Sequence, residues 1–274
     1  MPFALIEQIG RNTNNALAML GDFTLFAGRT LRWLSTWMLR WKNIRLLPPL
    51  MFEVGVRSIP VIALTGAFIG MVMAIETFTQ FKAIGQEERM GTVIGLSVVK
   101  QIGPVLAAVM LAGRIGGALT AELGTMNVTA QLDALRVMGA DPIRYLVVPR
   151  FLVCLLLLPV LTIYSDLLGI LGGWLVAVKS LGIANEPYWA NAAQGIETWQ
   201  IMEGVIKSFF FGGAIGLISC YKGFTCGSGA SGVGRACTES FVASFVAIIV
   251  INFFFAQVSK DWYMTLYGIR SLFG

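Results

Sequence analysis

Two lysines lie within long apolar stretches, where a charged side chain is costly and usually has a functional reason. Lys100 and Lys207 fall about 12 Å and 9 Å from the same end of their stretches, at 1.5 Å per residue. Two ammonium groups at one level can bind a phosphate oxyanion. Alternatively, both lysines extend to the membrane surface or pair with nearby acids. The sequence predicts a site for a lipid headgroup at Lys100, Lys207, Gln101, Glu76 and Asp166.

Other common kinds of site have little support. The chain has no histidine, the commonest general base and metal ligand. Its four cysteines lack a ligand pattern, although a zinc site at Cys220, Cys226 and Cys237 is conceivable. No G-x-x-x-x-G-K-[ST] motif is present to bind ATP phosphates. We therefore expect no metal and no cofactor in this chain, and any energy must come from a partner.

A glycine pattern near the C-terminus resembles a nucleotide motif only in its letters. Gly227, Gly229 and Gly232 spell G-x-G-x-x-G. A dinucleotide site needs a preceding strand and an acid about 20 residues later. Here an apolar stretch precedes, and the residues about 20 positions on read IIVINFFF. The pattern predicts a flexible loop instead.

Composition defines the elements that must position these residues. The 274 residues are 56% hydrophobic and only 13% charged, whereas soluble domains have about 25% charged residues. The chain is therefore predicted to be an all-α integral membrane protein with a single domain over 1–274. Five spans of about 20 residues form a core over about 59–258, at about 59–79, 92–112, 151–175, 201–221 and 241–258.

The segment from about 13 to 47 is interrupted by basic residues and reads as an amphipathic helix. Aromatic residues share one face and arginines the other, which is typical of a helix lying in the membrane interface. Packing on a partner is the alternative. Pro48 and Pro49 are expected to end it, and residues 1–10 lack the basic start of a secretory signal. The aromatic stripe contains Phe26, Thr30, Trp33, Trp37 and Trp41.

The basic residues indicate the orientation. Thirteen Lys and Arg residues fall on the side of the N-terminus and five on the other, with Lys100 and Lys207 left out. Since cytoplasmic loops carry the excess, we predict a cytoplasmic N-terminus and an external C-terminus. The net charge of +5 then gives no reason to expect nucleic acid as a partner.

A cytoplasmic segment at about 121–142 is predicted between the second and third spans. It contains a short amphipathic helix of about three turns, from Thr129 to Met138. Asn127 or Thr129 can cap its start, Gly139 can take the left-handed position after it, and Pro142 stops it. A solvated connector is the alternative, but most connectors have about 4–6 residues. A docking role is therefore predicted at Glu122, Thr129, Gln131, Leu132, Asp133, Leu135, Arg136, Met138 and Asp141.

Three runs carry a resemblance to a known family. They are 112–150, AGRIGGALTAELGTMNVTAQLDALRVMGADPIRYLVVPR, 232–244, GVGRACTESFVAS, and 97–105, SVVKQIGPV. Together they resemble motifs of the MlaE/YrbE family of ABC-transporter permeases, over roughly residues 50–260. Ala130 stands where the family usually has an acid, Lys100-Gln101 replaces the commoner Arg-Glu, and Cys237 replaces a threonine.

The resemblance implies an N-terminal interfacial helix, five spans and a short cytoplasmic coupling helix. It implies a homodimer in the bacterial inner membrane, with a separate cytoplasmic ATPase that binds ATP and Mg, and a periplasmic Mce-domain lipid-binding partner. The C-terminus would be periplasmic and the substrate a membrane lipid, most often a phospholipid. A lipid-modifying membrane enzyme finds no nucleophile or metal cluster here. An ATP-independent secondary transporter or channel remains the alternative.

Overall fold

The structure, a computed structural model, describes residues 2–38 and 46–267, and this part of the chain contains helices and no strand. The all-α prediction is confirmed. The α-helices are α1 (Pro2–Met38), α2 (Leu47–Val54), α3 (Ile59–Ala83), α4 (Met90–Ser97), α5 (Gly103–Leu111), α6 (Gly117–Val128), α7 (Gln131–Val137), α8 (Val148–Lys179), α9 (Asn185–Gly195), α10 (Thr198–Phe224) and α11 (Gly229–Tyr267). Short 3-10 turns η2 (Val56–Ser58) and η3 (Glu87–Arg89), and π-helical turns η4 (Val98–Ile102), η5 (Ala112–Gly116) and η6 (Ile143–Val147), join some of them.

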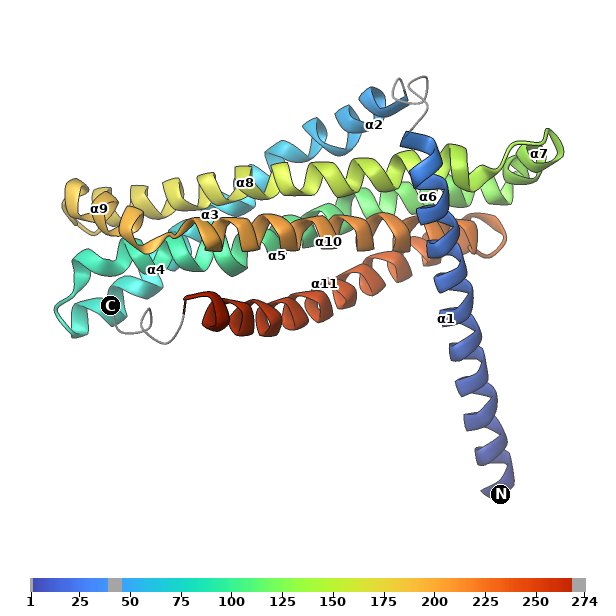
Figure 1. Cartoon of the computed structure of the whole chain (residues 1–274), viewed down its shortest axis with the longest axis horizontal. Helices are drawn as coiled ribbons and strands as arrows, with labels where there is room; N and C mark the ends of the chain where they lie inside the picture. Colours follow the sequence, from blue (N-terminus) through green and yellow to red (C-terminus); the bar gives the residue numbers. More distant parts are fainter. Residues whose placement is uncertain (1, 39–45, 268–274) are drawn as a thin grey trace.

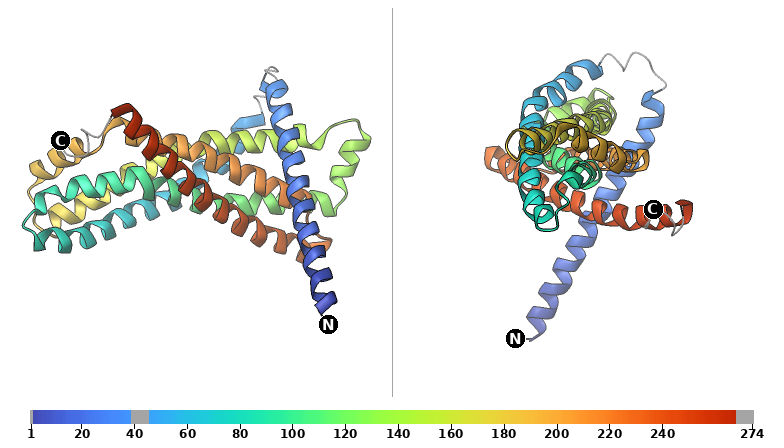
Figure 2. Two further views of the ribbon diagram at one scale, coloured as in Figure 1. Left: turned by 60° about the horizontal axis from the view of Figure 1, so that its bottom comes forward. Right: turned by 90° about the vertical axis from the view of Figure 1, so that its left-hand side faces the viewer.

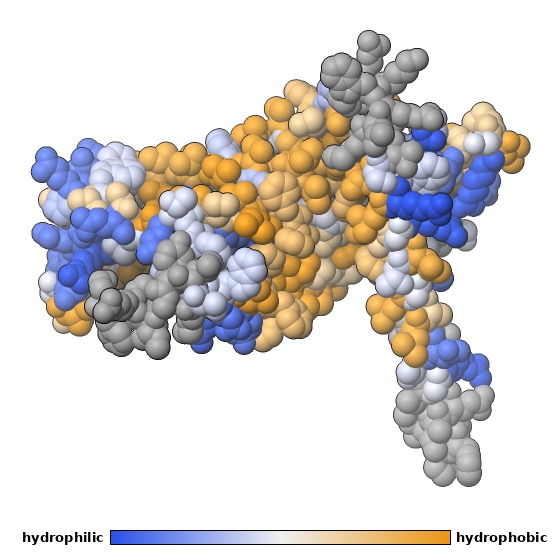
Figure 3. All heavy atoms as spheres, in the orientation of Figure 1, coloured by the Kyte–Doolittle hydropathy of each residue, from blue (hydrophilic) through white to orange (hydrophobic). Residues whose placement is uncertain are grey.

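Five helical stretches in the described part are long and apolar enough to cross a membrane, as predicted. A broad apolar surface covers the middle of the bundle and polar surface covers both ends (Figure 3). The stretches extend beyond the predicted bounds. The longest has 42 residues, or about 63 Å of helix, which is about twice the thickness of a hydrocarbon core. They are Leu47–Ala83, Glu87–Val128, Ile143–Lys179, Thr198–Phe224 and Gly229–Tyr263.

Helix α8 lies at the centre of the bundle and packs on α3, α10 and α5. Its contact with α3 depends on small residues, because the two backbones nearly touch. A Cβ on Gly70 would lie 1.8 Å from the Gly169 carbonyl oxygen, and one on Gly172 would lie 2.3 Å from the Ala67 carbonyl oxygen. The glycine-rich spans therefore pack as closely as predicted from their composition.

Helix α1 crosses the bundle, where it contacts η6, α8 and α10, and does not run along it (Figures 1 and 2). Three residues of the aromatic stripe, Phe26, Thr30 and Trp33, pack on the chain's own bundle, and the position of α1 in the membrane interface stays a prediction. Phe26 and Thr30 are buried, and the Phe26 ring meets those of Tyr221 and Phe224 edge-on at 5.6 Å. Of the stripe, the side chain of Trp37 and the whole of Trp41 lie outside the described residues.

The predicted bounds of the N-terminal helix need two corrections. Helix α1 begins at Pro2 rather than near residue 13 and ends at Met38. Pro48 and Pro49 occupy the first turn of α2, because a proline fits where a helix has no use for its N–H. The prolines thus begin a helix that leads into the first span.

The segments that the count of Lys and Arg residues placed on one side of the membrane lie together at one end of the bundle. Helix α1, helix α7 and the α10–α11 connection lie at one end of the bundle, and α9 lies at the other (Figure 1). Helix α11 runs from the α7 end toward the α9 end. The segments grouped by their basic residues therefore share one end of the molecule. Which end faces the cytoplasm stays a prediction.

Candidate functional site

The two intramembrane lysines meet between η4 and α10. The Lys207 ammonium donates to the Lys100 carbonyl oxygen at 2.8 Å and to Gln101 Oε1 at 3.1 Å. The two lysines therefore lie at one level of the bundle, and their depth in a membrane stays a prediction. Lys207 is fully buried, whereas the Lys100 side chain is 46% exposed. Lys100 therefore carries the ammonium that a ligand can reach.

A proline explains why Lys207 points at a backbone oxygen. In an α-helix, the Lys100 carbonyl would accept from the N–H of residue 104, but Pro104 has no N–H. The chain passes this position as a π turn, in which the Gly103 N–H donates to the Val98 carbonyl. Such turns are frequent at functional sites. Lys207 supplies the donor that Pro104 lacks.

The acid that pairs with the lysines is Glu203, which the sequence analysis missed. It is buried on α10, with Oε1 3.5 Å from the Lys207 ammonium and Oε2 3.8 Å from that of Lys100. Its spacing from Lys207, four residues on one helix, is a local signal that identifies the pair. A buried charge is tolerated when an opposite charge lies beside it, so the three groups stabilise one another in the bundle.

Glu203 also lines a cavity between α10 and α11, of about 280 Å³. Apart from Glu203 and Ser259, the lining side chains are apolar or aromatic. A charged cluster and a space suited to hydrocarbon therefore meet at one residue. The other lining residues are Trp199, Met202, Ile206, Phe210, Phe255, Val258 and Trp262.

The other two acids predicted for this site lie apart from the lysines. Among the described residues, neither Glu76 nor Asp166 forms an ion pair with Lys100 or Lys207. Glu76 is exposed on α3. Asp166 is buried on α8 behind the π turn, where a Cβ on Gly103 would collide with its Oδ1. Asp166 thus borders the turn that carries Lys100 without reaching its ammonium.

At the opposite end of the second span, the predicted cytoplasmic helix is shorter than expected. Most of the polar run continues the span as α6, and α7 has only seven residues. Neither proposed cap holds its start. Thr129 Oγ1 donates back to the Thr125 carbonyl at 2.8 Å, and Ala130 takes the cap position with φ 56°. Gly139 has φ 75°, so the predicted left-handed turn after the helix is confirmed.

The side chains of α7 divide into an inner and an outer set. Leu132 is 2% exposed and Leu135 is half-buried, whereas Val137 is 89% and Met138 72% exposed. The apolar positions therefore do not form one buried face. Gln131 is exposed, and Asp133 pairs with Arg136 at 2.9 Å on the surface. The tip presents apolar side chains beside a solvated ion pair.

Two predicted docking residues, Glu122 and Asp141, connect the helices around α7. Glu122 on α6 pairs with the buried Arg150 of α8 at 2.5 Å. Asp141 accepts from Trp33 Nε1 of α1 at 2.8 Å and from the Ile143 N–H at 3.0 Å. These contacts tie α1, α6 and α8 at the base of α7. The structure therefore gives both acids a positioning role.

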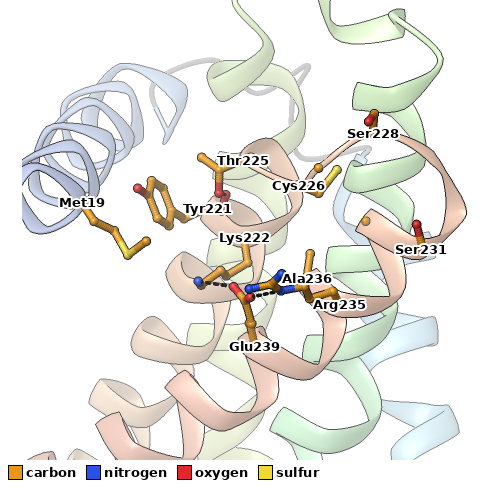
Figure 4. A pocket seen from close by; sticks show the side chains of 12 residues that line it. Met19, Tyr221, Lys222, Thr225, Cys226, Ser228, Ser231, Arg235, Ala236 and Glu239 are labelled. Carbon is orange, nitrogen blue, oxygen red and sulfur yellow. Dashed lines mark hydrogen bonds and ion pairs between the residues drawn. The ribbon is translucent and has the colours of Figure 1, made fainter. Parts of the chain in front are cut away.

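The glycine pattern lies at the start of α11, beside a cavity of about 670 Å³. Lys222 and Arg235 both bind Glu239 there, at 2.8 Å and 2.9 Å (Figure 4). No strand precedes the pattern in the described chain; helix α10 ends before it, and Gly229, with φ 78°, begins α11. Only Gly227 lies in a loop, because Gly229 and Gly232 belong to α11, so the predicted loop is shorter than expected; the context of a dinucleotide fold is absent from this part of the chain.

No group of three His, Cys, Asp or Glu side chains among the described residues is placed to hold a metal ion. The fold is that of a polytopic membrane protein whose buried charges gather between spans. The Permease MlaE profile matches residues 50–258. The chain belongs to the MlaE permease family, and so to the permease subunits of ABC transporters, which are not themselves enzymes.

Individual relatives cover most of the chain. A probable ABC transporter permease protein of Rickettsia conorii is 36% identical over 258 residues, 94% of this chain and 98% of that protein. A probable ABC transporter permease protein of Synechocystis is 43% identical over 202 residues, 73% of this chain and 76% of that protein. The intermembrane phospholipid transport system permease protein MlaE of Haemophilus influenzae is 34% identical over 218 residues, 79% of this chain and 84% of that protein.

Proposed function

We propose that this chain is the membrane-spanning subunit of an ABC transporter that moves phospholipids between the bacterial inner membrane and a periplasmic Mce-domain carrier. Two copies would form the permease, and a separate ATPase would bind ATP and Mg. The Haemophilus relative is named for intermembrane phospholipid transport. The lack of a P-loop in this sequence is consistent with an ATPase on another chain.

The arrangement at Lys100 carries the proposal. Its ammonium, on a half-exposed side chain, lies 3.8 Å from Glu203, and Glu203 lines the apolar cavity. A phospholipid has the matching parts, because its phosphate accepts charge-assisted hydrogen bonds and its acyl chain gains by leaving water. Lys100 would contact the phosphate. Lys207 and Gln101 would hold the turn that presents it.

The end of the molecule with α7 is proposed to face the cytoplasm, where the ATPase would dock. The excess of Lys and Arg on this side supports that orientation. The exposed Val137 and Met138 offer an apolar contact, and fully buried apolar centres are typical of protein interfaces. The C-terminus would then lie on the periplasmic side.

The test is lipid photocrosslinking and ATP-driven lipid transfer by the purified complex, comparing the wild type with Lys100→Met. We expect loss of both signals, because methionine keeps the side chain's length but removes its charge. The surface variant Lys179→Met, at the end of α8, is the matched control. Unchanged crosslinking in a correctly assembled Lys100→Met complex would contradict the proposed site. Transport by the lone chain in liposomes without ATP would instead favour a secondary transporter or channel.

A further inference from the structure

The three charges at the lysine site do not cancel. Lys100 and Lys207 bring two positive charges, Glu203 brings one negative charge, and Gln101 is neutral. Each ammonium lies within 4 Å of the one carboxylate. The cluster therefore has a net charge of +1 before a ligand arrives.

The uncompensated charge is presented on one side only. Lys207 donates to the Lys100 carbonyl oxygen and to Gln101 Oε1, it forms an ion pair with Glu203, and its side chain has no exposed surface. Glu203 is 2% exposed in its side chain, and neither of its oxygens accepts a hydrogen bond from the described residues. Lys100 is thus the point at which a ligand can neutralise the cluster.

We propose that Glu203 sets the charge of the headgroup that this site accepts, so that it favours a lipid phosphodiester over a lipid phosphomonoester. This inference rests on the proposed function. A phosphodiester such as that of phosphatidylglycerol carries one negative charge and balances the cluster. A phosphomonoester carries about −1.5 to −2 at pH 7, so it brings excess negative charge close to a buried carboxylate. The penalty is large where the dielectric constant is low.

The position of Glu203 gives it this role without contact to the phosphate. It lies within 4 Å of both ammonium groups and lines the apolar cavity, so it connects the two lysines to the space proposed for the acyl chain. Glu203 is a specificity-determining residue that acts through Lys100. Substituting Gln101 with Glu changes the net charge in the opposite direction. A carboxylate fits at this position because the Gln101 side chain already accepts a hydrogen bond from Lys207 at 3.1 Å.

The experiment measures competition between phosphatidylglycerol and phosphatidate with identical acyl chains for crosslinking to the purified complex. We expect Glu203→Gln, which raises the net charge to +2, to move the preference about tenfold toward phosphatidate, as expected for one unit charge a few ångströms away. Gln101→Glu removes one positive unit and should weaken both lipids, phosphatidate more. The double variant Glu203→Gln/Gln101→Glu restores +1 and should restore the wild-type preference. Glu186→Gln, an exposed acid-to-amide change on α9, is the control.

The outcomes separate this inference from the proposed function. If neither lipid crosslinks in a way that depends on Lys100, both the site and the inference fail. If Lys100-dependent crosslinking persists but the ratio of the two lipids is the same in the wild type, Glu203→Gln and Gln101→Glu, the inference fails and the proposed function stands. The opposite sign expected for Gln101→Glu keeps the test decisive even where Glu203→Gln does not assemble.

Discussion

Replacing Lys207 with methionine tests whether the buried lysine holds the site together. The variant keeps most of the side-chain volume but removes the donor to the Lys100 carbonyl and the ion pair with Glu203. Removing one partner of a buried ion pair destabilises by about 3–5 kcal/mol, and an orphaned buried carbonyl adds about 1–3 kcal/mol. We expect Lys207→Met to lower the free energy of unfolding by at least about 4 kcal/mol.

A second substitution separates the two contributions. In Lys207→Met, the Glu203 carboxylate keeps only the more distant Lys100 ammonium as a partner. Adding Glu203→Met removes this carboxylate. The double variant should lose only about 1–3 kcal/mol, the share of the unsatisfied carbonyl. The assay is reversible denaturation in mixed micelles, analysed as a double-mutant cycle. If the double variant is as unstable as the sum of the two single variants, Lys207 and Glu203 do not act as a pair and the reasoning is wrong.

Three further predictions concern packing, backbone strain and docking. Gly70→Ala should destabilise the bundle by about 1–3 kcal/mol through overpacking. Gly117→Ala is the control, because a Cβ at Gly117 meets nothing within 4 Å. Denaturation in micelles measures both variants, and equal losses of stability would contradict the close contact between α3 and α8. Ala130→Gly should slow hydrogen exchange in α7 by relieving about 1 kcal/mol of left-handed strain, and Ala130→Val should speed it; no difference between them would show that the cap is unstrained. Val137→Asp should leave thermal stability unchanged and reduce co-purification of the ATPase, and full recovery of the ATPase would exclude this face.

The spans could be predicted from the sequence because membrane helices need long apolar runs, a local property. The common level of Lys100 and Lys207 followed from simple counting along two such runs. The length of α6 could not be predicted, because its polar residues are compatible with both a loop and a helix that projects beyond the membrane. The choice depends on contacts with α10 and α11.

The candidate site was predicted only in part, although the sequence contains local signals for more of it. Two local signals were present: the four-residue spacing of Glu203 and Lys207, and Pro104 four residues after Lys100. The position of Asp141 under Trp33 is different. These residues are 108 positions apart, and only the path of α1 across the bundle brings them together. No pattern within either segment indicates this contact.

The second span has a mechanical consequence. Lys100 and α6 belong to one continuous helical stretch, Glu87–Val128, which contains the π turns η4 and η5. A π turn accommodates one extra residue in a helix. If the turn shifts by one position, the residue that it passes rotates by about 100° about the helix axis. The stretch is therefore a continuous helical connection between α6 and the lysine site, with a π turn at two positions. A rotation of α6 about its own axis would therefore be passed along this stretch toward the lysine site.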